Sequence, residues 1–334
     1  MSSPRSRHSR VRVTRCPRPP RIPVIVGPTA GGKTALAVEV AREFASRGLG
    51  GGEVISADAF QVYRGMDIGT GKATPEEQQG VPHHMLDILE PDDPEPFTVA
   101  RWLDLAARAI ADIRSRGRVP IVVGGTHLYI KSFMEGMFEG PGADEELRDQ
   151  LRALPPETLR AELERIDPAA AARIHANDER RTIRAIEVFR LTGVPISEHQ
   201  AQWDREASLR ADAFLVGLDW PVEQINPRIN SRVRQMMEAG FVDEVGGLLA
   251  SGRLGTQARE ALGYKQLAAW IEAGGSPGGL EETVERIKVE TRRFAKSQRT
   301  WLRRLRPLPG SIWLKPSEST SPVMAQLVVN QVFT

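Results

Sequence analysis

The sequence predicts an α/β fold in which a parallel sheet is flanked by helices and interrupted by a helical insertion. Three observations support this prediction. Apolar runs at residues 22–26, 53–56 and 118–123 alternate with helical patterns. A glycine-rich segment follows the first run directly, and residues 140–210 are poor in strand patterns and rich in Ala, Arg and Glu. Strands that alternate with helices in this way favour parallel pairing.

Length and composition indicate more than a minimal domain. The 334 residues, 40% of them hydrophobic, suffice for one full domain with a second domain or an insertion. We therefore expect a core of residues 22–139 and 211–315, a helical insertion of residues 140–210, and a C-terminal tail of residues 316–334. The net charge is only +2, and no apolar stretch is long enough to span a bilayer. No heptad seam indicates an oligomer, so a monomer is the expectation.

Residues 1–21 form a separate segment. They carry seven arginines, several prolines and no acidic residue, which predicts a disordered basic arm. A solvated tail, a misassigned start and an arm that touches nucleic acid all remain open for it. The chain's single cysteine, Cys16, lies in this segment, so an intrachain disulfide and a thiolate metal cluster are excluded. A reducing cytoplasm fits this composition.

The glycine-rich segment carries the most specific signal. It reads G-x-x-x-x-G-K-[ST] between the apolar run at 22–26 and the helical pattern at 35–44, which predicts a sheet of the P-loop NTPase type. In such a loop the backbone N–H groups converge on phosphate oxygens, Lys33 adds a charge, and Thr34 offers a hydroxyl to Mg²⁺. The predicted phosphate-binding residues are Gly27, Pro28, Thr29, Ala30, Gly31, Gly32, Lys33 and Thr34. Kinases, hydrolases and enzymes that expel diphosphate can all use this loop.

The next elements extend the sheet. Residues 53–56 form a predicted strand just before Asp58, residues 97–116 a helix, and residues 118–123 a strand that leads into Thr126. Ligands of open α/β sheets collect at the carboxyl ends of the strands. The phosphate loop, Asp58 and Thr126 are therefore expected to lie close together.

Helices dominate the second half of the chain. Residues 140–210 predict a helical insertion with breaks at its prolines, and residues 213–218 return to the sheet. Further helices are predicted at residues 227–239, 242–251, 263–273 and 280–305.

The last of these helices carries a basic stripe. Arg292, Lys296, Arg299, Arg303 and Arg306 recur at helical spacing, and Arg293 and Arg304 widen the stripe. A solvated basic face remains open as an explanation. A track for a phosphate backbone is the better reading, because Arg180, Arg181 and Arg184 add further charge in the insertion. The partner would be a polyanion larger than a nucleotide.

Together these segments resemble a known family. The phosphate loop, residues 56–70 (SADAFQVYRGMDIGT), residues 82–88 (PHHMLDI), residues 124–129 (GGTHLY) and residues 263–266 (GYKQ) are similar to the bacterial tRNA dimethylallyltransferases, also called tRNA isopentenyltransferases. The resemblance covers residues 22–313. It implies transfer of a dimethylallyl group from dimethylallyl diphosphate to N6 of the adenosine 3′ of the anticodon, in tRNAs that read codons beginning with U. The loop would then hold diphosphate, the leaving group.

Residue chemistry suits this reaction. The exocyclic amine of adenine is a poor nucleophile, so a general base helps. Asp58 matches the family's proposed base, although a turn or an Mg²⁺ ligand remains open for it. Lys33, the loop amides and Mg²⁺ near Thr34 would stabilise the charge on diphosphate. Arg228 and Arg232 match a family Arg-Ile-x-x-Arg segment and could clamp the same oxygens, or could simply pair at the surface. Mg²⁺ is the expected cofactor, and ATP binding by the loop stays open.

The resemblance also assigns tRNA contacts. Thr126 could shape the entry for a base extracted from its stack. The matching positions are Asp58, Ala59, Phe60, Gln61, Thr126, Arg148, Arg180, Arg181, Thr182, Ile183, Arg184, Glu260, Gly263, Tyr264, Lys265, Arg292, Arg293, Lys296 and Gln298. Two departures stand out: Ala59 replaces the serine of many relatives, and the zinc finger of eukaryotic relatives is missing. His83 and His84 lack an identified third ligand, so they are expected to be structural.

Other function classes stay open. A small-molecule kinase would share the phosphate loop and the sheet but would leave the basic helix unexplained. An isopentenyltransferase acting on free AMP, ADP or ATP to make cytokinin would share the chemistry without needing the insertion. A nucleic-acid-binding protein without catalysis would leave the loop and Asp58 unused.

Overall fold

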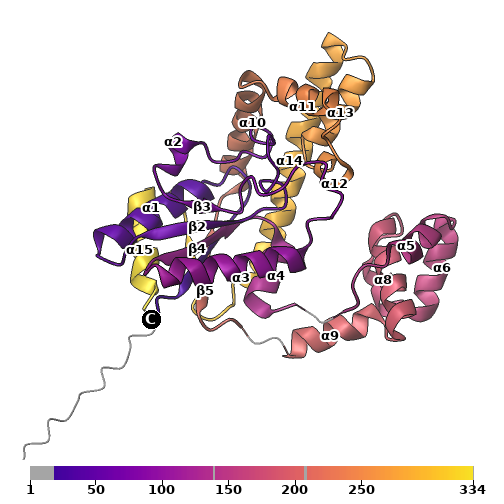
Figure 1. The fold of residues 1–334 in the computed structure, drawn as a ribbon, viewed down its shortest axis with the longest axis horizontal. Helices are drawn as coiled ribbons and strands as arrows, with labels where there is room; N and C mark the ends of the chain where they lie inside the picture. The colour runs from indigo at the N-terminus through magenta and orange to yellow at the C-terminus, as the bar shows by residue number, and fades with distance from the viewer. Residues whose placement is uncertain (1–18, 138–139, 207–208, 334) are drawn as a thin grey trace, which may run out of the picture.

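A single parallel sheet organises the protein. The computed structural model describes residues 19–137, 140–206 and 209–333, and within them six strands pair in the order β3-β2-β4-β1-β5-β6 (Figure 1). Every pair of neighbouring strands is parallel. The strands are β1 (Ile22–Val26), β2 (Gly52–Ala57), β3 (His83–His84), β4 (Val119–Gly124), β5 (Ala213–Leu218) and β6 (Ile312–Leu314). The predicted α/β class is confirmed. Residues 1–18 of the predicted basic arm, including Cys16, lie outside the described residues.

The sheet is buried on both faces. All residues of β1, β2, β4 and β5 are buried, which explains their continuous apolar character. Side chains alternate between two core clusters: Val24 joins Trp102 of α3 (Val99–Ser115), whereas Ile25 joins Phe44 of α1 (Lys33–Ser46). Helix α4 (His127–Glu135) packs with α3 on the first face. Each large apolar side chain buried here contributes about 1.5–3 kcal/mol.

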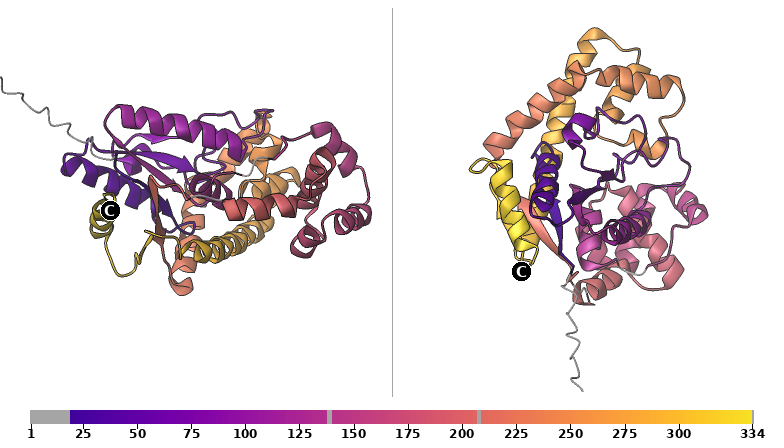
Figure 2. Two further views of the ribbon diagram at one scale, coloured as in Figure 1. Left: turned by 90° about the horizontal axis from the view of Figure 1, so that it is seen from below. Right: turned by 60° about the vertical axis from the view of Figure 1, so that its left-hand side comes forward.

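Three elements at the margins of the sheet differ from the prediction. His83 and His84 form β3, because they pair with β2 where a loop was expected. Strand β6 adds to the opposite edge. The segment predicted as a C-terminal tail contains α15 (Ser321–Gln331), which lies against α1 in both views of Figure 2. Its buried residues are Met324, Ala325, Val328 and Val329. Most of that segment therefore belongs to the core.

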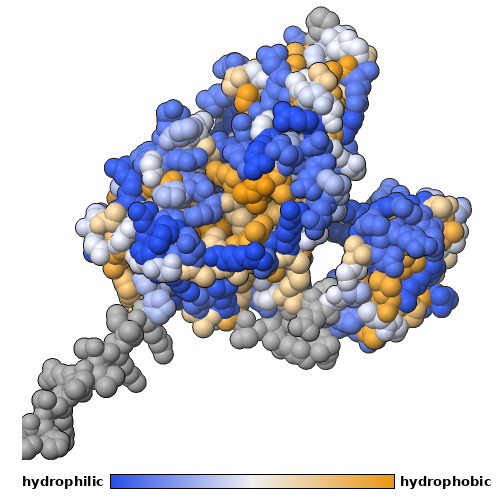
Figure 3. Space-filling view, viewed as in Figure 1, coloured by the Kyte–Doolittle hydropathy of each residue, from blue (hydrophilic) through white to orange (hydrophobic). Residues whose placement is uncertain are grey.

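Residues 140–206 form a helical insertion with its own small core. Its helices are α5 (Glu145–Arg152), α6 (Pro156–Ile166), α7 (Pro168–Arg173), α8 (Glu179–Thr192) and α9 (Ile196–Glu206). Leu151, Leu163 and Ile186 belong to a cluster that contains only insertion residues. Figures 1 and 3 show the insertion standing to one side of the sheet. The predicted breaks match the helix ends, since Asp167 caps α7 and Gly193 ends α8.

A second helical group lies beyond the carboxyl ends of the strands. It consists of α10 (Val222–Glu238), α11 (Phe241–Ala250), the short α12 (Thr256–Arg259), α13 (Tyr264–Glu272) and α14 (Pro277–Leu305). Helix α10 begins before Pro227 rather than at it, since Pro227 lies inside the helix. A further short helix, α2 (Pro75–Gln78), was not predicted. Helix α14 packs on α10 and α13 and extends back toward the sheet (Figure 1). Of the helices in the described ranges, none has the length and apolarity needed to cross a membrane.

Candidate active site

The phosphate loop connects β1 to α1 in a backbone form that requires glycine. Gly32, the N-cap of α1, has φ 81°, in the left-handed region. A Cβ on Gly31 would lie 2.7 Å from the carbonyl oxygen of Pro28. Two side chains fix the loop from outside: Trp220 Nε1 donates to Gly31 O at 2.9 Å, and Arg228 Nε donates to Ala30 O at 3.0 Å. The loop is therefore held open at the start of a helix, where anions bind favourably.

Lys33 lies under this loop. Its Nζ donates to the carbonyl oxygens of Gly27 and Pro28 at 3.2 and 3.0 Å. Burial, with the positive charge of Arg232, lowers the pKa of Lys33 to about 8, although the Asp58 carboxylate opposes this shift. A bound phosphate would favour the charged ammonium. Among the described residues the Thr34 hydroxyl has no hydrogen-bond partner, so its oxygen is available as a hard ligand of the kind Mg²⁺ prefers.

Gln298 of α14 ties the phosphate loop to β4. Its side-chain oxygen accepts from Thr29 N at 2.9 Å, and its amide nitrogen donates to Gly125 O at 3.1 Å. The side chain is only 3% exposed. A Cβ on Gly125 would lie 2.3 Å from that amide nitrogen, so a larger residue there would displace the Gln298 amide. Gln298 was predicted to contact tRNA. That contact stays a prediction, and within the protein Gln298 positions two loops.

Asp58 follows β2 and uses its two carboxylate oxygens differently. Its Oδ1 accepts from the backbone N–H groups of Phe60 and Gln61, at 2.9 and 3.3 Å. In the described part of the chain, its Oδ2 has no hydrogen-bond partner. The turn role that the sequence left open is therefore real for one oxygen, and the other remains available for a substrate or a metal ion.

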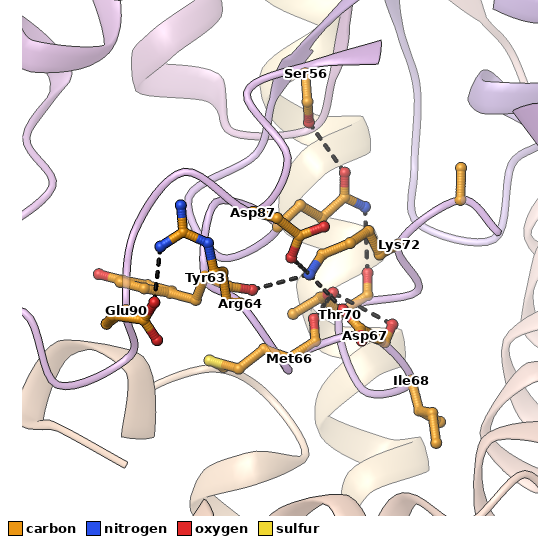
Figure 4. Close-up of polar contacts among 12 residues, drawn as sticks. Ser56, Tyr63, Arg64, Met66, Asp67, Ile68, Thr70, Lys72, Asp87 and Glu90 are labelled. Atoms are coloured by element: carbon orange, nitrogen blue, oxygen red, sulfur yellow. Dashed lines mark hydrogen bonds and ion pairs between the residues drawn. The ribbon is translucent and has the colours of Figure 1, made fainter. Parts of the chain in front are cut away.

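The loop that carries Asp58 is braced by a buried lysine (Figure 4). Lys72 Nζ donates to Tyr63 O at 2.8 Å, and it pairs with Asp87 at 2.6 Å and with Asp67. Gln61, which was predicted to contact tRNA, accepts from Ser56 Oγ at 3.0 Å and donates to the backbone of residues 70 and 71. These contacts fix the position of the loop before any ligand arrives.

Glu244 of α11 anchors the far end of the same loop. Its carboxylate accepts from the backbone N–H groups of Asp67, Ile68 and Gly69, at 2.9, 2.8 and 3.2 Å. It also accepts a hydrogen bond from the Tyr264 hydroxyl. Burial, with the adjacent carboxylate, raises the pKa of Tyr264 well above its ordinary value. Sequence reasoning missed Glu244, because nothing in its local pattern distinguishes it from a surface glutamate.

A cavity of about 460 Å³ is lined by residues of the phosphate loop and of the loop that carries Asp58. Arg232 lines it and donates to Gly71 O at 3.2 Å, and burial lowers the pKa of this guanidinium. The polar lining comes from the phosphate loop (Thr29, Ala30) and from Asp58, Thr126 and Glu260. The apolar lining comes from Phe60, Ile229, Val233, Met236, Phe241, Leu262, Ile287 and Phe294. The cavity can therefore hold a ligand with an anionic group and an apolar chain.

His127 also lines the cavity, and the sequence analysis did not single it out as a site residue. Its ring lies 5.4 Å from that of Trp301, and its buried Nδ1 has no partner among the described residues. Burial, with the charge of Arg181 on the insertion, lowers the pKa of His127. The signal that could have found it is its place in the GGTHLY segment, directly after Thr126.

The predicted tRNA contacts fall into three groups. Asp58, Ala59, Phe60, Thr126 and Glu260 line the cavity. The side chains exposed on the surface are those of Arg180, Arg181, Lys265, Arg293 and Lys296. The buried residues are Thr182, Ile183, Gly263, Tyr264 and Gln298. The family segments were assigned whole, whereas a helix turns part of each segment inward.

Three further arginines predicted to contact tRNA have protein partners. Arg148 and Arg184 both pair with the buried Glu187, at 2.9 and 2.6 Å. These two cations, together with the backbone N–H of Asp144, hold the pKa of Glu187 below its ordinary value against the effect of burial. Arg292 donates to Asn230 Oδ1 at 2.5 Å. Arg148 and Arg184 thus stabilise the insertion, whereas Arg180 and Arg181 are exposed at the start of α8, where Arg181 lies 3.5 Å from Asp178.

His83 and His84, which were expected to be structural, form strand β3. His83 Nδ1 lies 2.8 Å from Val81 O, and His84 Nε2 lies 2.7 Å from Glu53 Oε2. In the described ranges, no group of three or more His, Cys, Asp or Glu side chains could hold a metal ion.

Fold and site together define a phosphate-loop α/β enzyme with a largely apolar cavity, which Thr29 and Ala30 of the loop and Asp58 line. The chain belongs to the IPP transferase family, whose model matches residues 61–305; an isopentenyl transferase model matches residues 20–89. The resemblance inferred from the sequence motifs is confirmed, and the protein is a prenyl transferase.

Named relatives agree with this assignment. The chain is 42% identical over 318 residues to the tRNA dimethylallyltransferase of Geobacillus thermodenitrificans, covering 94% of this chain and 95% of the relative. It is 46% identical to that of Symbiobacterium thermophilum, covering 85% and 87%. Among solved structures, the tRNA isopentenylpyrophosphate transferase of Bacillus halodurans superposes with TM-score 0.66 at 37% identity, covering 93% and 96%. A eukaryotic dimethylallyltransferase acting on tRNA gives 0.72 at 29% identity, covering 88% and 73%.

Proposed function

We propose that this protein transfers a dimethylallyl group from dimethylallyl diphosphate to N6 of the adenosine immediately 3′ of the anticodon, in tRNAs that read codons beginning with U. One observation carries the proposal: a single cavity of about 460 Å³ is lined by the phosphate loop, by Asp58 and by apolar side chains. An allylic diphosphate needs an anion site and an apolar space next to it. The attacking amine needs a base within reach.

The phosphate loop would stabilise the departing diphosphate. The C–O bond breaks as charge develops on the diphosphate oxygens, where the loop N–H groups, the dipole of α1 and Lys33 act together. Arg232 lines the cavity and adds positive charge, whereas Arg228 holds the loop through Ala30 O. Thr34, with the free oxygen of Asp58 as a second candidate ligand, would hold Mg²⁺. The ion would supply further neutralisation of the diphosphate.

Asp58 is the proposed general base. The adenine N6 lone pair attacks the allylic carbon, and a proton leaves N6 as the new C–N bond forms. The second oxygen of Asp58 has no partner in the described residues and can accept this proton, while Oδ1 stays bound to the turn. Thr126, on the same cavity, is positioned to border the entry of the extracted base.

The tRNA partner is supported by exposed positive charge on two elements. Arg180 and Arg181 lie at the start of α8, and Arg293 and Lys296 lie on α14. After burial, the charge of Arg181 on the insertion is the second cause that lowers the pKa of His127 at the cavity. A free adenine nucleotide would need neither group, which favours tRNA over cytokinin synthesis. A kinase would leave the apolar lining unexplained. We further propose a monomer that acts in the cytoplasm.

The decisive experiment follows radiolabel from dimethylallyl diphosphate into an anticodon stem-loop RNA that has adenosine 3′ of the anticodon. Free AMP and ATP turnover are measured in parallel. We expect label in the RNA only, in N6-dimethylallyladenosine. Label in AMP alone would move the assignment to cytokinin synthesis, and ATP turnover without label would favour a kinase.

A further inference from the structure

A second cavity lies beside the phosphate loop. It has a volume of about 420 Å³ and shares no lining residue with the candidate catalytic cavity. Its walls come from the segment after β5, the last turns of α14 and the segment after β6. Trp220 lines this cavity and also donates to Gly31 O of the phosphate loop at 2.9 Å. The family motifs described above leave this space unassigned.

Two hydrogen-bond donors at this cavity lack acceptors. Arg299 Nη1 and Trp313 Nε1 are both inaccessible to solvent, and neither has a hydrogen-bond partner among the described residues. Buried donors of folded proteins are almost always paired, so two such donors around one space call for an explanation. An acceptor-rich ligand would supply it.

The charge at the cavity is also unbalanced. Arg306 pairs with Asp219 and Lys315 pairs with Glu318, each at 3.0 Å, so these four groups neutralise one another. Arg299 and Arg303, one turn apart on α14, remain; in the described chain the Arg303 guanidinium has no ion pair. Burial lowers the pKa of Arg299 and the like charge of Arg303 adds to this shift, although the carboxylates of Asp219 and Glu223 oppose it. A bound anion would relieve both effects.

We propose that this cavity is an anion site for the phosphate or diphosphate group of a small molecule, held by Arg299, Arg303 and the indole N–H of Trp313. Phosphate oxygens offer many acceptors at once, and guanidinium groups match their geometry. The structure thereby divides the basic stripe. Arg299, Arg303 and Arg306 line the cavity, whereas Arg293 and Lys296 do not.

Isothermal titration of the full chain with inorganic diphosphate tests the proposal. We expect two sites in the wild-type protein. Lys33→Ala should weaken the phosphate-loop site at least tenfold and leave the second site unchanged. In that background, Arg303→Ala should weaken the second site at least tenfold, and Trp313→Phe should weaken it by less. Arg304→Ala is the matched control, because Arg304 is an exposed neighbour that does not line the cavity.

A titration with ADP distinguishes the possible sources of the anion. ADP carries the same diphosphate group as the inorganic ion, so tighter Arg303-dependent binding of ADP indicates a nucleotide ligand, and equal binding indicates free diphosphate. Arg303→Ala acts on an exposed side chain and should leave the thermal unfolding midpoint unchanged.

Two results would overturn the proposal. The first is a single site in the wild-type protein that Lys33→Ala removes. The second is an Arg303→Ala variant that binds diphosphate with normal affinity but binds anticodon stem-loop RNA as weakly as the Arg293→Ala variant does. That result would make Arg303 an RNA-binding residue. Failure of Lys33→Ala to change diphosphate binding would count against the proposed function alone.

Discussion

At the scale of single residues, the site depends on side chains whose two polar atoms have different roles. Asp58 closes its own turn with Oδ1 and keeps Oδ2 available, and Gln298 joins Thr29 to Gly125 with the two ends of one amide. Such residues fix the backbone around a ligand before it binds. Their structural and chemical roles can be separated only by substitutions that remove one role and keep the other.

The Asp58→Asn substitution separates the structural role of Asp58 from its proposed chemical role. Asparagine keeps an oxygen that can accept from Phe60 N and Gln61 N, so the turn and the thermal unfolding midpoint should be preserved. The amide cannot take the N6 proton, so kcat for transfer to the anticodon stem-loop should fall by about 10²–10⁴-fold. Asp58→Ala should lose activity and also destabilise the turn. An Asp58→Asn variant with normal kcat would show that Asp58 is a turn residue only.

At the scale of elements, a buried carboxylate joins one edge of the sheet to its neighbours. Glu53 of β2 is fully buried and accepts from Arg116, from Arg118 at 2.9 Å, and from His84 of β3 at 2.7 Å. Hydrogen bonds from Arg116, helped by His84, lower the pKa of Glu53 to about 2 although burial opposes this. The ionised form is therefore the one that stabilises this edge.

The Glu53 contribution to stability depends on pH in a defined direction. A carboxylate with a depressed folded-state pKa stabilises the protein above its ordinary pKa of 4.5, and this stability is lost as pH falls from there toward about 2. The loss should be on the order of 3 kcal/mol, read from urea unfolding at several pH values. Glu53→Gln should be less stable at pH 7 and should show a flatter dependence between pH 4.5 and 2. An unchanged slope would contradict this account.

The packing of helix α15 leads to a second prediction at the scale of elements. Val328 is completely buried against the face of the sheet that α1 covers, whereas Val323 on the same helix is 49% exposed. Val328→Asp would bury an unpaired charge and should lower the free energy of unfolding by more than about 3 kcal/mol. Val323→Asp, the matched control, should change it by less than about 0.5 kcal/mol. Equal effects in urea unfolding would mean that α15 does not pack as described.

At the scale of the whole molecule, the proposed function requires the insertion and the sheet to contact one tRNA. The insertion carries its own core and stands beside the sheet (Figure 2). Arg180 and Arg181 are exposed at the start of α8. A tRNA that reaches the cavity can contact both parts. The energy of such contacts comes largely from released counterions, so it depends on salt.

The double variant Arg180→Ala/Arg181→Ala tests this arrangement. It should bind the anticodon stem-loop more weakly at low salt, and the slope of log affinity against log salt should become shallower by about 1.5. Fluorescence anisotropy at several KCl concentrations measures both quantities. Arg165→Ala is the control, since Arg165 is exposed on α6 of the same insertion. If the double variant and Arg165→Ala changed the affinity and the salt slope equally, the RNA would not bind at Arg180 and Arg181.

The sequence by itself determined the α/β class, the phosphate loop and the family. These depend on local order: a glycine pattern between a strand and a helix, and motifs whose residues are consecutive. Four of the six strands and the long helices were also predicted, because a strand buried on both faces is a continuous apolar run and a helix buried on one face repeats its apolar residues, and each leaves a local pattern. The short β3 and β6 carry too few residues to show one.

Only the tertiary structure decided which residues of each motif face a ligand. Tyr264 and Gln298 belong to matching segments, yet Tyr264 bonds Glu244 and Gln298 bonds the phosphate loop. Their partners lie 20 and 269 residues away along the chain, so no local pattern records them. The packing of α15 on α1, the apolar lining of the cavity and the unpaired donors of Arg299 and Trp313 arise in the same way. Each depends on distant segments meeting, which the periodicity of a single segment cannot specify.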